Sequence, residues 1–342
     1  MPHKIPLHVI VQKIQNRQIT ETDARKIFTV APNPAKPFDF NIRFNADAVD
    51  VSNAPSASLL AGPLLRDTGI GLQFNRLPRV PKSPKKFPRK LPLIAEGDSW
   101  FKLPDVHPPV PRTLIDFLQP QFSTVNLAHW GDTLADIILK GQFWPYLQSD
   151  SADVFLFSGG GNDVLGDGEL WRFLELFDVD HARPKDAPYY LNQDFYDNLN
   201  VIISSYERLI NAIKLRAPHV VMLGHGYDYA IPRIDGPWLG GPMTRQGIDP
   251  IDHAELGEAI VRLIIDTFNN RLQALEQTHS KNFKYVNLRG TVKRREWWDE
   301  LHPFEVAAKK TAVKYASAIR TLPASSEMLA FPFDEHFNRL VA

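Results

Sequence analysis

From residue 91 onward, short continuous apolar runs alternate with longer segments in which apolar residues recur at helical spacing. The short runs predict buried strands over 91–95, 124–127, 153–158, 219–223 and 283–288. Apolar residues three and four positions apart predict helices over 132–140, 196–215, 255–278 and 303–319. Strands that alternate with helices indicate a parallel sheet covered on both faces. We therefore expect an α/β protein, a three-layer α/β/α sandwich around a five-stranded, mainly parallel sheet.

The first 90 residues follow a different pattern, and we expect them to form an N-terminal extension and a linker. Residues 6–30 predict two short helices, the second capped by Thr20, and the pattern then weakens. Residues 76–90 carry prolines and basic side chains without an acidic one, which is typical of an extended tether. Contact of this basic segment with a membrane surface is the alternative. The predicted organisation is an extension over 1–75, a linker over 76–90, an α/β domain over 91–322 and a tail over 323–342.

Composition excludes several classes of function. The chain has 39 basic and 39 acidic residues, so its charge gives no reason to expect a nucleic-acid partner. Because there is no cysteine, disulfides, thiolate metal sites and a cysteine nucleophile are excluded. The apolar stretch from Ile5 to Val11 is broken by Pro6 and His8, unlike a secretory signal, and no stretch reaches the roughly 18 apolar residues that span a bilayer. We therefore expect a cytoplasmic location.

One motif offers a nucleophile, and a second, distant motif offers a base. The strand 91–95 runs into Glu96-Gly97-Asp98-Ser99, a turn that would bring a serine to the edge of the sheet, where it needs a base. Asp299 precedes His302 by three residues, so one turn can place both side chains together and let the carboxylate orient the imidazole. Taken alone, each motif also fits an ordinary turn. No second histidine stands at helical spacing from His302, so no metal and no other cofactor is predicted.

A glycine run follows the third predicted strand, in Ser158-Gly159-Gly160-Gly161-Asn162-Asp163. Val164 stands where a dinucleotide fingerprint needs its third small residue, and no Gly-Lys-Ser/Thr follows, so a phosphate cradle is not indicated. An electrostatic use fits better, because the amide of Asn162 can donate to an oxyanion. Gly131 follows another predicted strand and offers a backbone N–H for the same purpose.

These blocks occur in a fixed order, each just beyond a predicted strand of one sheet. In this order the chain resembles the SGNH (GDSL-type) hydrolase family, through Gly-Asp-Ser, an isolated glycine, Gly-Gly-Asn-Asp and Asp-x-x-His. The resemblance covers 91–322 and implies a flavodoxin-like strand order. It also implies roles for five residues: Ser99 as nucleophile, His302 as general base, Asp299 as its orienter, and an oxyanion hole of the Ser99 and Gly131 N–H groups with the Asn162 side chain.

The resemblance implies a lipase- or esterase-type serine hydrolase that cleaves carboxylic esters through an acyl-enzyme on Ser99. Phospholipase, lysophospholipase or thioesterase activity on lipids, and a non-catalytic binding protein on the same scaffold, are the alternatives. The expected partner is a small-molecule or lipid ester. The loop from Gly236 to Met243 is either a lid or pocket wall, or an ordered loop packed by Trp238. Candidate pocket residues are Trp100, Trp238, Met243 and Trp298, and candidate structural hydrogen-bonding residues are His129, Asp163, His225 and Asp228.

Overall fold

The computed structural model describes residues 4–15, 26–32, 40–50, 90–103, 110–149, 152–234 and 236–322. Contacts within the chain divide it into two compact units, one of residues 1–77 with 103–111 and one of residues 78–102 with 112–342. Most of the predicted linker and all of the predicted tail lie outside the described residues, so their boundaries stay predictions.

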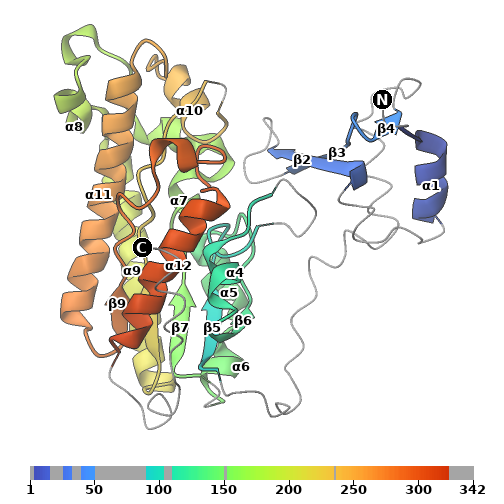
Figure 1. Ribbon diagram of the computed structural model, residues 1–342. Helices are drawn as coiled ribbons and strands as arrows, with labels where there is room; N and C mark the ends of the chain where they lie inside the picture. The colour runs from blue at the N-terminus through green and yellow to red at the C-terminus, as the bar shows by residue number, and fades with distance from the viewer. Residues whose placement is uncertain are drawn as a thin grey trace. The chain divides into compact units, whose positions relative to one another are not determined.

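The N-terminal unit contains one helix and two small sheets. Strand β1 (Ile5–Pro6) pairs in parallel with β4 (Val49–Asp50), and helix α1 (Leu7–Gln15) follows β1. Strands β2 (Phe28–Pro32) and β3 (Phe40–Phe44) form an antiparallel pair (Figure 1). Helix α1 confirms the first of the two predicted short helices, while Thr20, the expected cap of the second, lies outside the described residues.

The second unit is built on a five-stranded sheet in which every neighbouring pair is parallel. Its strands are β5 (Pro92–Glu96), β6 (Ser123–Asn126), β7 (Val154–Phe157), β8 (Val221–Gly224) and β9 (Phe283–Tyr285). Their order is β6-β5-β7-β8-β9, so both the parallel sheet and the flavodoxin-like order are confirmed. The order reverses at β5, and in such sheets ligands bind outside the carboxyl ends of the strands at this switch point.

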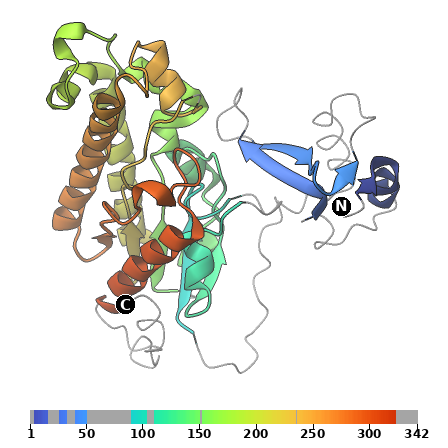
Figure 2. The ribbon, with the colours of Figure 1, turned by 45° about the horizontal axis from the view of Figure 1, so that its top comes forward.

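Helices cover the sheet in two layers. Five of them are α4 (Leu114–Leu118), α5 (Leu134–Lys140), α9 (Gln193–Arg216), α11 (Ala254–Thr278) and α12 (Glu305–Arg320). Helix α4 packs against α12, while α9 packs against both α5 and α11. Right-handed crossovers explain this division. Between parallel strands, a helix whose connection steps toward one edge of the sheet packs on one face, and a helix whose connection steps toward the other edge packs on the opposite face. The three-layer α/β/α sandwich is therefore confirmed, and Figures 1 and 2 show the helices running alongside the strands.

The other helices among the described residues of this unit are α6 (Trp144–Leu147), α7 (Asn162–Leu165), η2 (Gly166–Phe173), η3 (Val179–His181), η4 (Pro184–Asp186), α8 (Ala187–Tyr190), α10 (Gly240–Arg245) and η5 (Arg294–Glu296). The core lies on both faces of the sheet, and all four side chains of β7 are buried. The Asn192 side chain caps α9 by accepting the Phe195 N–H at 3.2 Å. Within the described ranges, no helix has both the length and the apolar character that a membrane span requires.

Candidate active site

A tight turn after β5 places Ser99 at the carboxyl edge of the sheet. Gly97 has φ +158°, and a Cβ there would lie 2.5 Å from the Ser158 carbonyl oxygen, so only glycine lets the backbone pass. The Asp98 carboxylate then accepts the Trp100 N–H at 3.0 Å, which closes the turn around the serine. Ser99 is 5% exposed. Gly97 and Asp98 thus determine the backbone geometry of the turn, and Ser99 supplies the hydroxyl.

Ser99, His302 and Asp299 form a continuous chain of hydrogen bonds. Ser99 Oγ lies 2.8 Å from His302 Nε2, and His302 Nδ1 lies 2.7 Å from Asp299 Oδ2. The other oxygen, Asp299 Oδ1, accepts the backbone N–H groups of Leu301 and His302 at 2.8 and 2.7 Å. Because the carboxylate accepts from Nδ1, we assign the proton to Nδ1, which leaves Nε2 free to accept from the Ser99 hydroxyl. The arrangement can therefore move a proton from Ser99 to His302.

The three expected oxyanion donors follow the ends of three adjacent strands, β6, β5 and β7. In the described part of the chain, the backbone N–H groups of Ser99 and Gly131 donate to no acceptor. Gly131 adopts φ +80°, a conformation that favours glycine. The Asn162 amide is buried and donates one N–H to the Asp132 carbonyl at 2.7 Å. This bond orients the amide and leaves its second N–H for another acceptor.

A buried polar cluster lies beside the nucleophile turn, and sequence reasoning found only part of it. Ser158 Oγ donates to Asp98 Oδ1 at 2.7 Å and lies 3.2 Å from His225 Nε2. The Tyr227 hydroxyl donates to Asp98 Oδ2 and accepts the Gly161 N–H at 2.9 Å. Burial raises the pKa of Asp98 and lowers the pKa of His225 to about 3, so His225 is a neutral partner. The structural role expected for His225 fits these contacts, whereas Tyr227 was missed.

Glu300 organises the loop that faces the base, and nothing in the sequence pattern singled it out. Its buried carboxylate accepts four backbone N–H groups, from Arg233, Trp238, Leu239 and Gly240, at 2.8 to 3.0 Å. In return, the Arg233 guanidinium donates to the carbonyls of Trp297 and Trp298 at 2.7 and 3.0 Å.

Two positions in this loop need glycine, because neighbouring atoms leave no room for a Cβ. A Cβ at Gly236 would lie 2.1 Å from Glu300 Cδ, and one at Gly240 would lie 1.7 Å from the Arg233 carbonyl oxygen. Trp238 is 1% exposed, so it packs the loop as the second of the two interpretations requires. The segment from Gly236 to Met243, whose second half belongs to α10, is therefore anchored to the block that carries Asp299 and His302.

Of the four candidate pocket residues, two lie beside the base. The Trp238 and Trp298 rings are centred 5.8 and 6.2 Å from the His302 ring. Trp100 instead donates its indole N–H to the Leu301 carbonyl at 3.1 Å and is 6% exposed. Met243 is fully buried. A role of these residues in a substrate pocket stays a prediction.

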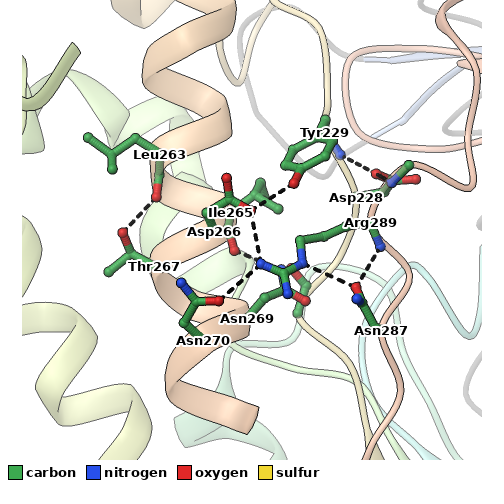
Figure 3. Close-up of polar contacts among 12 residues, drawn as sticks. Asp228, Tyr229, Leu263, Ile265, Asp266, Thr267, Asn269, Asn270, Asn287 and Arg289 are labelled. Carbon is green, nitrogen blue, oxygen red and sulfur yellow. Dashed lines mark hydrogen bonds and ion pairs between the residues drawn. The ribbon is translucent and has the colours of Figure 1, made fainter. Parts of the chain in front are cut away.

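Asp228 ties together the loops that follow β8 and β9. Its carboxylate accepts the backbone N–H groups of Gly290 and Val292 at 2.6 and 2.7 Å. Beside it, Arg289 forms an ion pair with Asp266 of α11 at 2.9 Å (Figure 3). These contacts hold the chain segment that leads to Asp299, which agrees with the structural role expected for Asp228.

The fold and the hydrogen-bonded serine, histidine and aspartate together have the arrangement of a serine hydrolase. No family model and no curated protein matches the chain. Several solved structures do match. The lipase Lip_vut3 from a goat rumen metagenome is 15% identical, with a TM-score of 0.45, covering 67% of this chain and 97% of that one.

Two further structures match at similar levels. A putative GDSL-like lipase from Parabacteroides merdae is 14% identical, with a TM-score of 0.41, covering 69% of this chain and 98% of that one. A mutant of Axe2, an acetylxylan esterase from Geobacillus stearothermophilus, is 15% identical, with a TM-score of 0.39, covering 70% of this chain and 100% of that one. The matched structures thus include a lipase, a putative GDSL-like lipase and an acetylxylan esterase, each at 14 to 15% identity.

Proposed function

We propose that this protein is a serine hydrolase that cleaves carboxylic esters through an acyl-enzyme on Ser99. The observation that carries the proposal is the 2.8 Å contact between Ser99 Oγ and His302 Nε2, with the opposite ring nitrogen held by Asp299 at 2.7 Å. A serine hydroxyl is a weak nucleophile until a base accepts its proton. Here the base is within hydrogen-bond reach and its orientation is determined by a buried carboxylate.

Acylation begins when Ser99 Oγ attacks the carbonyl carbon of the ester while His302 Nε2 takes the hydroxyl proton. The carbonyl oxygen becomes an oxyanion, which accepts from the N–H groups of Ser99 and Gly131 and from the Asn162 amide. Collapse of the tetrahedral intermediate breaks the ester C–O bond, and the imidazolium returns its proton to the departing alcohol. Asp299 stabilises the imidazolium throughout without taking its proton.

Deacylation repeats these steps with water. His302 removes a proton from the water molecule as its oxygen attacks the acyl carbon, and the same donors bind the second oxyanion. When the bond to Ser99 Oγ breaks, the imidazolium protonates Oγ, and the carboxylic acid leaves. The free hydroxyl and the neutral histidine are restored, so the cycle balances in protons.

A fluorophosphonate probe and an activated p-nitrophenyl ester test the proposal directly. We expect the wild-type protein to label and to turn over the ester, and Ser99→Ala to lose both while keeping its circular dichroism spectrum. Ser205→Ala is the matched control, because the hydroxyl of this half-buried serine bonds only within its own helix α9, donating to the Val201 carbonyl and accepting from Arg208. A wild-type protein that does not label would favour the non-catalytic alternative. Turnover that survives Ser99→Ala would refute the assignment of the nucleophile.

Trp298, which is half-buried with its ring centred 6.2 Å from the His302 ring, supports an ester whose acyl or alcohol group has an apolar surface. The Trp238 ring meets the His302 ring at an interplanar angle of 88°, and the Trp298 ring meets it at 51°. The basic segment 76–90, on which contact with a membrane surface would depend, lies outside the described residues apart from Lys90. A series of p-nitrophenyl esters of increasing acyl length measures the preference for the acyl group, through kcat/KM for each ester.

A further inference from the structure

Tyr227 has an unusual backbone conformation. Among the described residues it is the only non-glycine residue with a positive φ, at 65°. This conformation is unfavourable for a residue with a Cβ and persists only where the surroundings hold it. The Tyr227 ring is held by aromatic neighbours, with ring centres 5.1 Å from His225, 5.5 Å from Trp100 and 6.1 Å from Phe268.

The hydroxyl of Tyr227 joins two segments that are far apart in the chain. It donates to Asp98 Oδ2, and Asp98 directly precedes Ser99. It also accepts the Gly161 N–H at 2.9 Å, and Gly161 directly precedes Asn162. One oxygen atom therefore connects the turn of the nucleophile, after β5, with the segment of the proposed oxyanion donor, after β7.

The fit around this hydroxyl is tight. A Cβ at Gly161 would lie 2.9 Å from Tyr227 Cζ, so a side chain at that position would displace the ring. Burial, reinforced by the charge of Asp98, raises the pKa of Tyr227 well above its usual value, so the phenol remains a neutral hydroxyl. The other carboxylate oxygen of Asp98 already accepts from Trp100 and Ser158. Without the tyrosine hydroxyl, Asp98 Oδ2 and the Gly161 N–H would each lack a partner among the described residues.

We propose that Tyr227 is a positioning residue for the hydrolysis: its hydroxyl sets the spacing between the Ser99 turn and the segment that carries Asn162. The inference rests on the proposed function and deepens it. Tyr227 acts through Asp98 and Gly161 and does not touch the substrate. The oxyanion forms only during the reaction, so misplaced donors weaken binding of the transition state more than binding of the ester.

Tyr227→Phe removes only the bridging oxygen. With a p-nitrophenyl ester, we expect kcat to fall about 10- to 100-fold, less than the loss on removing a donor outright, while KM stays near the wild-type value. Tyr315→Phe is the matched control, because Tyr315 is fully buried and its hydroxyl has no partner among the described residues. We expect that variant to keep the wild-type kcat. Wild-type kcat in Tyr227→Phe, or an equal fall in both variants, would overturn the proposal.

A double-mutant cycle identifies the route of the effect. If Tyr227 acts through Asn162, then Tyr227→Phe should reduce kcat far less in an Asn162→Ala background than in the wild type. Effects that multiply in full would show that the two residues act independently, and would overturn the proposal.

Incorporation of 3-fluorotyrosine at position 227 covers the case in which Tyr227→Phe does not fold. It keeps the ring and the hydroxyl but makes the oxygen a weaker acceptor for the Gly161 N–H. We expect a lower kcat with an unchanged KM, and an unchanged kcat would contradict the inference. Fluorophosphonate labelling of the wild-type protein tests the proposed function separately, because it does not depend on any change at Tyr227.

Discussion

Glu300→Gln should destabilise the protein more than its conservative chemistry suggests. Each carboxylate oxygen of Glu300 accepts two backbone N–H groups, Oε1 from Arg233 and Gly240 and Oε2 from Trp238 and Leu239. Glutamine keeps one oxygen and turns an amide NH₂ toward the other pair, which then has no acceptor. A buried N–H that loses its acceptor costs about 1–3 kcal/mol, so the pair costs about 2–6 kcal/mol.

An opposing effect reduces this figure. Burial raises the pKa of Glu300, and the four N–H donors hold back part of that rise, so removing the charge relieves a desolvation cost. We therefore expect a net loss of about 2–4 kcal/mol in the free energy of unfolding. Since domains are typically stable by about 5–15 kcal/mol, this loss is easily measured in urea unfolding followed by tryptophan fluorescence.

Glu305→Gln is the matched control for this experiment. Glu305 is half exposed and pairs with Arg112 at 3.0 Å, and an exposed ion pair contributes at most about 1 kcal/mol. A Glu300→Gln protein no less stable than Glu305→Gln would refute the argument that the buried carboxylate holds the loop. The same variant should also lower kcat, because the loop places Trp238 beside His302.

Three other variants test separate parts of the structure. Asp299→Asn should lower kcat for a p-nitrophenyl ester by about 10⁴-fold with its fold intact, because the amide favours the wrong tautomer of His302; near wild-type turnover would contradict the proposed role. Gly97→Ala should not accumulate as folded protein, since its Cβ would lie 2.5 Å from the Ser158 carbonyl oxygen, and cooperative unfolding near the wild-type midpoint would show that the turn can adjust. Burial raises the pKa of Glu96 from 4.5 to about 7, so the folded protein binds a proton there that the unfolded chain releases. Stability should therefore fall by about 3 kcal/mol as the pH rises through this window, and Glu96→Gln should remove that fall in urea unfolding at about pH 5 and about pH 8.

The sheet and the serine–histidine contact could be predicted because their signals are local. Continuous apolar runs mark buried strands wherever they pair, and the Gly-Asp-Ser and Asp-x-x-His blocks each follow such a strand. Element ends were less accurate: the strand expected over 283–288 ends at Tyr285, and the helix expected from Pro303 begins at Glu305.

The parts that sequence reasoning missed depend on contacts between distant segments. Glu300 stands between two recognised site residues and looks like an ordinary acidic side chain, yet its four partners are 60 to 67 positions away. Tyr227 follows an apolar strand and would pass for a core aromatic, because neither its backbone conformation nor its hydroxyl partners has a periodic signature. Hydrophobic patterning reports burial, whereas these residues are determined by which polar groups the fold brings together.

The distance along the chain between the nucleophile and its base has a further consequence. Ser99 and His302 are 203 positions apart, and His302 lies just before α12, the last helix among the described residues. A ribosome must therefore have made nearly the whole α/β unit before the two side chains can meet, so the nascent protein stays chemically inert until late in its synthesis. Reactivity of Ser99 toward a fluorophosphonate therefore reports on folding. In a refolding time course, this reactivity should first appear when the segment of β9 and α12 packs on the sheet.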